Sequence, residues 1–420
     1  MKKKVCSGLT YYYNHDEKMS GVVSTRVQMR DKVDAKLLEE AVNEALEYHK
    51  DYKVQPEVTD NVLYFVDNPN PFRVEEGPEK DICMIRDTQG YLFYIRVEER
   101  CIEFDFYHMI MDGIAYCTFF RTVLDLYFAK KCPDECDWKK CIEESTKNIT
   151  TEASCQESLF MERIFKTAEH IRKTDAAKEE TIENYYNMYD YDDEDKRLCV
   201  YLHTGKIQEY ADKWKIQPYV LVNVLLGNVI GNKHVASYMP INMRHFLKLG
   251  DYSYECLAYL NVPHVKQENS FEEQCITYQN SLRHHLGYRK AFKILKEDAD
   301  LIRILQKESM SVSRKKAIVQ RVMKRTEMYR GTFCTSYMPF LKEDDIMCNY
   351  VMDFQACTPR SGMGIILEMA QVGATISLNI RYQAHVEDII RKFVDELKKL
   401  DMYKDSVELE ICNMHIALPE

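Results

Sequence analysis

The chain has 420 residues, enough for two domains of ordinary size, and its 45% apolar and 30% charged residues are typical of a globular protein with a substantial core. Its net charge of −10, with no run of more than three lysines or arginines, excludes nucleic acid as an expected partner. Since no apolar run reaches the roughly 20 residues of a membrane-spanning helix, we also expect no transmembrane segment.

The N-terminal half contains a strand–loop–helix junction. Residues 33–50 predict an amphipathic helix, because apolar residues recur every three or four positions. Residues 91–107 predict two strands joined by a tight turn, and the pattern becomes helical after Gly113. His108 therefore stands at the end of a strand and Asp112 at the start of a helix, in a type of junction where functional residues often collect.

The C-terminal half repeats the mixture of strands and helices. An acidic, apolar-poor stretch at residues 188–198 predicts a linker between an N-terminal lobe, residues 1–187, and a C-terminal lobe, residues 199–420. Near the end, a hairpin across residues 371–373 precedes a final amphipathic helix. Because both halves combine helices with mainly antiparallel strands, we predict an α+β fold in which each lobe is a two-layer α/β sandwich.

His108, Asp112 and Gly113 form the pattern His-x-x-x-Asp-Gly. An imidazole ionises near neutral pH, so a neutral His108 can accept a proton from a hydroxyl or amine as that group attacks a carbonyl carbon. Such general-base help is worth on the order of 10²–10⁴ in rate. Asp112 could orient a neighbouring group, and Gly113 allows close packing. The spacing alone also fits a half-buried structural histidine beside an aspartate that caps a helix.

The junction and several further segments resemble the chloramphenicol-acetyltransferase-like superfamily, which includes the condensation domains of non-ribosomal peptide synthesis and the alcohol acetyltransferases. The further segments are the helix at 33–50, "PINMRHFLKLG" at 240–250 with "CLAYLNV" after it, and "TFCTSYMPF" at 332–340. The resemblance implies two similar lobes that form a V around a central tunnel. It also implies a crossover strand near 332–340 that lends residues to the other lobe.

The resemblance implies an acyltransferase that moves an acyl group from a thioester donor to an alcohol or amine, with His108 as general base. Acyl-coenzyme A is the favoured donor, as a co-substrate and not as a bound cofactor, and the alcohol-acetyltransferase-like branch is the favoured subfamily. A phosphopantetheine thioester on an acyl carrier protein is the alternative donor, and a small molecule is the acceptor. Ser336 matches the position of an oxyanion donor best, and Thr335 is the second match.

The resemblance further implies that Asp112 is structural and pairs with Arg244, although Arg244 would also fit an ordinary surface position. The sequence departs from the motifs of this family at two places. Tyr107 stands where many condensation domains have a second histidine, and "TPRSGMG" at 358–364 does not match the family's Asp-Phe-Gly-Trp-Gly motif. Two other functions therefore stay open: a freestanding condensation-like enzyme that uses carrier-protein thioesters, and a non-catalytic two-lobe binding protein.

Other features of the sequence are weaker indications of function. Cys132, Cys136 and Cys141 lack the paired spacing of zinc ligands, so we expect no metal. The basic stretch 313–325 fits either a solvated helix face or a surface that attracts the phosphates of a donor. The basic N-terminus lacks the apolar segment of a secretory signal, and the 15 scattered cysteines favour reduced thiols, so we expect a cytoplasmic protein.

Overall fold

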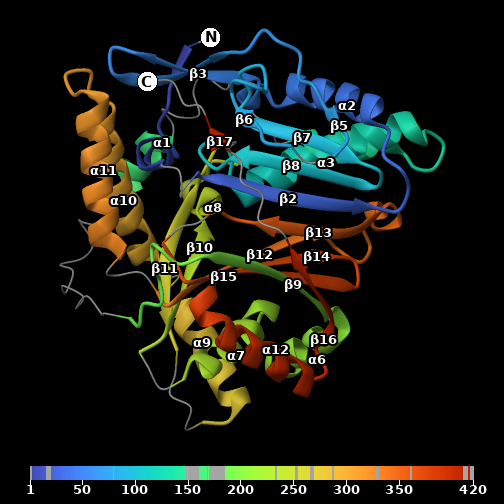
Figure 1. Ribbon diagram of the computed structural model, residues 1–420, viewed down its shortest axis with the longest axis vertical. Helices are drawn as coiled ribbons and strands as arrows, with labels where there is room; N and C mark the ends of the chain where they lie inside the picture. The colour runs from blue at the N-terminus through green and yellow to red at the C-terminus, as the bar shows by residue number, and fades with distance from the viewer. Residues whose placement is uncertain are drawn as a thin grey trace.

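Two β-sheets, each covered by helices, organise the computed structural model of the protein (Figure 1). The structure describes residues 2–15, 20–78, 80–147, 149, 160–167, 169, 185–231, 234–250, 254–264, 269–285, 288–327, 331–359, 362–409 and 415–416. Among these residues, none of the helices is both long enough and apolar enough to span a bilayer.

The first sheet has five strands, four of which come from the first 107 residues of the chain. In spatial order they are β13 (Val351–Cys357), β2 (Val22–Met29), β8 (Cys101–Tyr107), β7 (Phe93–Glu98) and β5 (Glu75–Glu76). All neighbours pair antiparallel except β5 and β7, which are parallel. A three-stranded antiparallel sheet lies nearby, with the order β1 (Lys2–Lys4), β4 (Val62–Asp67) and β3 (Val54–Thr59).

Two long helices, α2 (Ala35–Tyr48) and α3 (Gly113–Lys131), pack against each other and cover one face of the first sheet (Figure 1). The apolar stripe predicted for α2 is its buried face. Its N-terminus is capped by Asp34, whose carboxylate accepts hydrogen bonds of 3.0 Å from the backbone N–H groups of Lys36 and Leu37. Helix α4 (Trp138–Thr146) follows α3 and contacts it.

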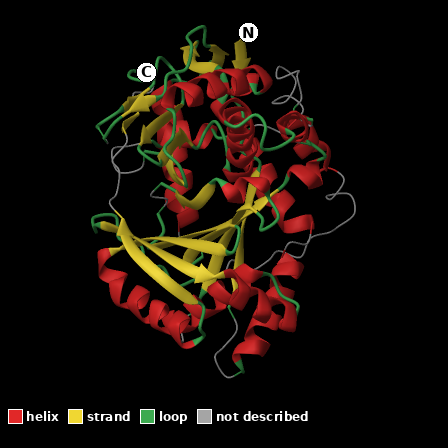
Figure 2. Ribbon diagram, turned by 90° about the vertical axis from the view of Figure 1, so that its right-hand side faces the viewer, coloured by secondary structure: helices red, strands yellow, loops and turns green. Residues whose placement is uncertain are grey.

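The second sheet has seven strands, all from residues 195–409. In spatial order they are β11 (Leu257–Pro263), β10 (Ala236–Asn242), β12 (Phe333–Leu341), β14 (Ile365–Val372), β15 (Thr375–Gln383), β9 (Asp195–His203) and β16 (Tyr403–Leu409). Its outer face is covered by helices, which lie together below the sheet in Figure 2: α6 (Thr204–Trp214), α7 (Pro218–Ile230), α9 (Phe271–His285) and α12 (Glu387–Lys399). The hairpin and final helix predicted near the C-terminus are β14–β15 and α12.

The strand that crosses between the two halves is β13, so the prediction of a crossover at 332–340 is wrong. That segment is β12, which stays in the second sheet and pairs in parallel with β10 and β14. β13 instead pairs antiparallel with β2 in the first sheet. The reason lies in its side chains, because Val351, Phe354 and Ala356 are buried in the core of the N-terminal half.

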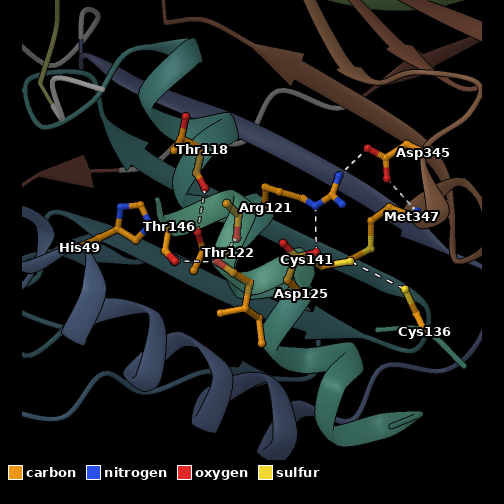
Figure 3. A network of polar contacts seen from close by, with 12 residues as sticks. His49, Thr118, Arg121, Thr122, Asp125, Cys136, Cys141, Thr146, Asp345 and Met347 are labelled. Carbon is orange, nitrogen blue, oxygen red and sulfur yellow. Dashed lines mark hydrogen bonds and ion pairs between the residues drawn. The ribbon is translucent and has the colours of Figure 1, made fainter. Parts of the chain in front are cut away.

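A polar network fixes the connection from β12 to β13 against α3 (Figure 3). The Arg121 guanidinium of α3 donates to Asp125 on its own helix, at 2.9 Å, and also to Asp345. Asp345 in turn caps the short 3₁₀ helix η2 (Ile346–Asn349) by accepting from the Met347 backbone N–H at 2.9 Å. The crossing point is therefore anchored on the N-terminal half by charge-assisted hydrogen bonds.

The boundary between the halves is less simple than the sequence predicts. Strand β9 begins at Asp195, within the expected linker 188–198, because Asp195 pairs with Arg381 of β15. Helices α10 (Tyr288–Leu305) and α11 (Val312–Glu327) belong to the C-terminal half in sequence. They nevertheless pack beside α1 (Leu9–Asn14), and Leu295 and Val319 join the N-terminal core (Figure 1).

The remaining described elements are short. They comprise α8 (Arg244–Leu247), the 3₁₀ helices η1 (Lys50–Tyr52) and η3 (Ala384–Val386), and a parallel pair of strands, β17 (His415–Ile416) and β6 (Cys83–Met84). Of these, α8 matters most for the site, because it carries Arg244 from the C-terminal half toward the His108 loop.

Candidate active site

His108 stands directly after the last residue of β8, at the junction predicted from the sequence. Its backbone N–H donates to the Gly21 carbonyl at 2.8 Å, which holds the end of β8 beside β2. Four residues later Asp112 is the N-cap of α3, and its carboxylate accepts from the Ala115 backbone N–H at 3.0 Å. The loop between His108 and Asp112 is thus fixed by a strand at one end and a helix cap at the other.

Asp112 and Arg244 form a buried ion pair across the two halves of the chain. The two guanidinium nitrogens Nη1 and Nη2 of Arg244 donate to Oδ2 and Oδ1 of Asp112 at 2.8 and 3.0 Å. Oδ2 also accepts from the Cys256 backbone N–H at 3.0 Å. Burial favours the neutral acid, but Arg244 and the backbone donors outweigh it and hold the pKa of the Asp112 carboxyl below its usual value.

His108 is enclosed, because the residue is only 7% exposed. The Tyr11 ring of α1 stacks on it, with 4.7 Å between ring centroids and 10° between ring planes. Burial lowers the pKa of His108 below 6.5, although its own backbone carbonyl and Asp112 partly oppose the shift. The imidazole is therefore neutral at neutral pH, which is the form that accepts a proton.

Two glycines allow the backbone and side chains to come close to His108. Gly8 has a φ of +67°, and a Cβ there would lie 2.7 Å from the backbone of Met109. A Cβ on Gly113 would lie 2.6 Å from the Sδ atom of Met338, on β12 of the second sheet. Glycine at both positions lets elements of the two halves approach the loop that carries His108.

His108 lines a cavity of about 460 Å³ whose wall is built from both sheets. The first sheet and α3 contribute Phe106 and Tyr116, and the second sheet contributes Ser336 and Met338. Because side chains alternate along a strand, Thr335 lies on the opposite face of β12 and is buried there, away from the cavity wall. Of the two residues proposed from the resemblance as oxyanion donors, only Ser336 faces the cavity.

Four carboxyl groups on the cavity wall were not singled out from the sequence, and three of them have raised pKa values: Glu255 before β11, Asp298 on α10 and Glu368 on β14. Burial raises their pKa values, to about 8 for Glu255 and about 7 for both Asp298 and Glu368. For Glu255 the negative charges of Asp112 and Asp298 add to the rise. Glu368 stands directly opposite Ser336 in the register of β14 and β12, and the Ser336 hydroxyl partly opposes the rise of its pKa.

The other clusters noted in the sequence lie away from His108. The Sγ atoms of Cys136 and Cys141 are 3.7 Å apart beside the Arg121 network (Figure 3). Across the described part of the chain, no group of three side chains is placed to bind a metal ion. The basic stretch forms α11, whose Lys316, Arg321 and Lys324 are exposed, while Val322 and Met323 on the same helix line the cavity.

Solved structures share this fold at low sequence identity. The condensation domain of Monacolin K polyketide synthase aligns with a TM-score of 0.59 and 12% identity, over 96% of this chain and 97% of that one. A variant of the starter condensation domain of rhizomide synthetase, in complex with C8-CoA and Leu-SNAC, aligns with a TM-score of 0.61 and 10% identity, over 95% and 94%. Polyketide synthase associated protein 5 from Mycobacterium tuberculosis aligns with a TM-score of 0.60 and 11% identity, over 96% and 99%.

These comparisons define the class of fold: the chain is a mixed helix-and-sheet protein with the fold of condensation domains, as the sequence resemblance predicts. The alignments cover about 95% of the chain, so the likeness includes both halves. No protein-family model and no curated protein matches the sequence.

Proposed function

We propose that the protein is an acyltransferase that moves an acyl group from a thioester to an amine or alcohol, with His108 as general base. The observation that carries the proposal is a neutral, enclosed imidazole on the wall of a 460 Å³ cavity between the two sheets. A cavity of this size accommodates a small acceptor together with the reactive end of a donor. The fold shared with a domain that is in complex with C8-CoA supports the same reaction class.

The proposed reaction requires one proton to move twice. His108 accepts the proton of the attacking hydroxyl or amine as the new C–O or C–N bond forms at the thioester carbonyl. When the tetrahedral intermediate collapses, the C–S bond breaks and the thiolate takes the proton back from His108. The products are an ester or amide and a free thiol, so the imidazole returns to its neutral state.

In this proposal Ser336 supplies a hydrogen bond to the oxyanion of the intermediate. An ionised Glu368 would compete, because it would accept the Ser336 hydroxyl proton itself. A protonated Glu368 can instead donate to the Ser336 oxygen and leave the hydroxyl hydrogen available for the oxyanion. The raised pKa of Glu368, to about 7, keeps a substantial protonated fraction near neutral pH. One well-placed oxyanion donor is worth about 10²–10³ in kcat.

Acyl-coenzyme A is the proposed donor, as a co-substrate, and a carrier-protein thioester is the alternative. None of the described residues that line the cavity is a lysine or arginine, so the cavity itself offers no partner for phosphates. The exposed cations of α11 lie on the helix whose apolar side reaches the cavity, and they could hold the phosphates outside while the thioester enters.

The test is thiol release from short- and medium-chain acyl-coenzyme A in the presence of a panel of amines and alcohols. We expect release that depends on the acceptor and that is lost in His108→Ala. Release only from carrier-bound acyl groups would show that the donor is a carrier-protein thioester, and the proposed reaction class would stand. No release from either donor would reject the proposal in favour of a binding protein.

A further inference from the structure

The cavity that contains His108 is acidic. Four of its wall residues are carboxylic acids, Glu255, Glu297, Asp298 and Glu368, whereas none of its described wall residues is a lysine or arginine. In the described part of the chain, no cation lies within 4 Å of Glu255 or Asp298 to form an ion pair. Glu255 is partly exposed and Asp298 is exposed, and both side chains line the cavity.

Aromatic rings stand beside these carboxyl groups. The Tyr11 hydroxyl donates to Oε1 of Glu255 at 3.4 Å and lies 3.5 Å from the hydroxyl of Tyr259. Tyr259 stacks on Tyr238 with 5.0 Å between ring centroids, and all three tyrosines line the cavity. Carboxylates combined with exposed aromatic faces favour an organic cation, because both attract positive charge.

Tyr11 contacts both Glu255 and the proposed base, His108. One face of its ring stacks on the His108 imidazole, while its hydroxyl reaches Glu255. Apart from its own carbonyl, the Nδ1 atom of His108 meets no hydrogen-bond partner in the described part of the chain, although the side chain is only 7% exposed. His108 and Glu255 thus contact the same tyrosine ring on the wall of one cavity.

We infer that the acceptor is a diamine or a related compound, whose second, protonated amino group binds Glu255 and Asp298 while the first is presented to His108. The inference rests on the proposed function, since it names the acceptor of that reaction. It gives Glu255 and Asp298 a role, because an ammonium group supplies the positive partner that the described residues of the cavity wall do not offer. Binding would also favour ionisation of Glu255 and Asp298, whose pKa values are raised when the cavity is empty.

The experiment compares acceptors that differ only in the second amino group, 1,4-diaminobutane and butylamine, with the same acyl-coenzyme A donor. We expect kcat/KM to be at least 10-fold higher for the diamine. Glu255→Gln and Asp298→Asn should each reduce this ratio several-fold. The matched control is Asp300→Asn, which removes the same charge from α10 at a residue that pairs with Lys296 and does not line the cavity. It should leave the ratio unchanged.

A binding measurement separates failure of this inference from failure of the proposed reaction. Calorimetric titration of 1,4-diaminobutane into the His108→Ala variant needs no turnover, and it should show binding that Glu255→Gln in the same background weakens at least 10-fold. Diamine binding without acyl transfer would keep the inference and reject the reaction. Acyl transfer with equal kcat/KM for both acceptors, or a ratio unchanged in Glu255→Gln and Asp298→Asn, would overturn the inference.

Discussion

Removing one partner of the buried Asp112–Arg244 pair should strongly destabilise the junction that carries His108. Asp112 is fully buried and accepts four N–H hydrogen bonds, two of them from Arg244. Asp112→Asn replaces one carboxylate oxygen with an amino group that faces these donors, and it leaves Arg244 as an uncompensated buried charge. Breaking a buried pair in this way costs about 3–5 kcal/mol, a large share of the stability of an ordinary domain.

A double-mutant cycle measures the interaction itself. Arg244→Met removes the charge and keeps much of the side-chain volume, so the variant with both Asp112→Asn and Arg244→Met contains no unpaired ion. We expect it to be less destabilised than the sum of the two single variants by about 2–3 kcal/mol. If the losses in the free energy of unfolding of the two single variants simply add in the double variant, Asp112 and Arg244 are not a coupled pair. A loss of less than about 1 kcal/mol in Asp112→Asn would refute the account as well.

The assay is urea unfolding followed by the fluorescence of one tryptophan. The chain has two, Trp138 and Trp214. Trp138 is buried in the N-terminal core, where it stacks on Phe128, whereas Trp214 packs on the core of the C-terminal half. In a Trp214→Phe background, Trp138 reports unfolding of the half that contains Asp112. The free energy of unfolding then follows from the linear dependence on urea concentration.

Three further predictions follow from the geometry around the cavity. Gly8→Ala should cost about 1–3 kcal/mol, because a left-handed φ of +67° and the backbone of Met109, 2.7 Å from the new Cβ, leave no room to relax. Gly113→Ala should lower kcat/KM more than stability, because the flexible Met338 side chain, 2.6 Å away, can move into the cavity. The Glu368 carboxyl holds its proton to higher pH when folded, with a pKa of about 7 against 4.5, so its stabilising effect is complete below pH 4.5 and is lost as pH rises toward 7. The loss amounts to about 3 kcal/mol.

Each of these predictions has a matched comparison. Gly77→Ala is the control for Gly8→Ala, because Gly77 also has a positive φ but no atom within 4 Å of a new Cβ. Equal losses of stability at the two sites would show that the Met109 contact does not contribute to the cost of Gly8→Ala. Adding Met338→Ala to Gly113→Ala should restore part of kcat/KM. If it restores none, the loss in Gly113→Ala is not caused by a clash with Met338. Between pH 4.5 and 7, the free energy of unfolding of Glu368→Gln should change less with pH than that of the wild type. An equal change in both proteins would exclude Glu368 as the source of the pH dependence.

Local patterns explain which parts of the fold could be predicted. The change from alternating to helical periodicity located the end of β8 and the start of α3, and therefore the position of His108 and the cap at Asp112. The approach of Arg244, 132 residues further along the chain, has no local signal, and only the family resemblance placed it beside Asp112. The family resemblance placed the crossover on β12, and only the tertiary pairing with β2 identifies β13 as the crossing strand.

The acidic part of the site was missed for a similar reason. Asp298 lies on an amphipathic helix, where an acid normally indicates a solvated face, and it lines the same cavity as Glu255 only because α10 packs beside β11. The sequence did give an indication for Glu368, since it is the one charged residue in the mainly apolar strand "IILEMAQV". A lone acid in a buried strand is costly unless it has a partner or a function, and it could have been selected on that ground.

The central claim is that His108 is the base of an acyl-transfer reaction in this cavity. The most direct test is mass-spectrometric detection of the acylated acceptor formed by wild-type and His108→Ala protein from the same acyl-coenzyme A and the same amine. The account predicts product with the wild type and a rate at least about 10²-fold lower with the variant, while donor binding measured by calorimetry stays within a few-fold. Product formed at equal rates by the two proteins would contradict it.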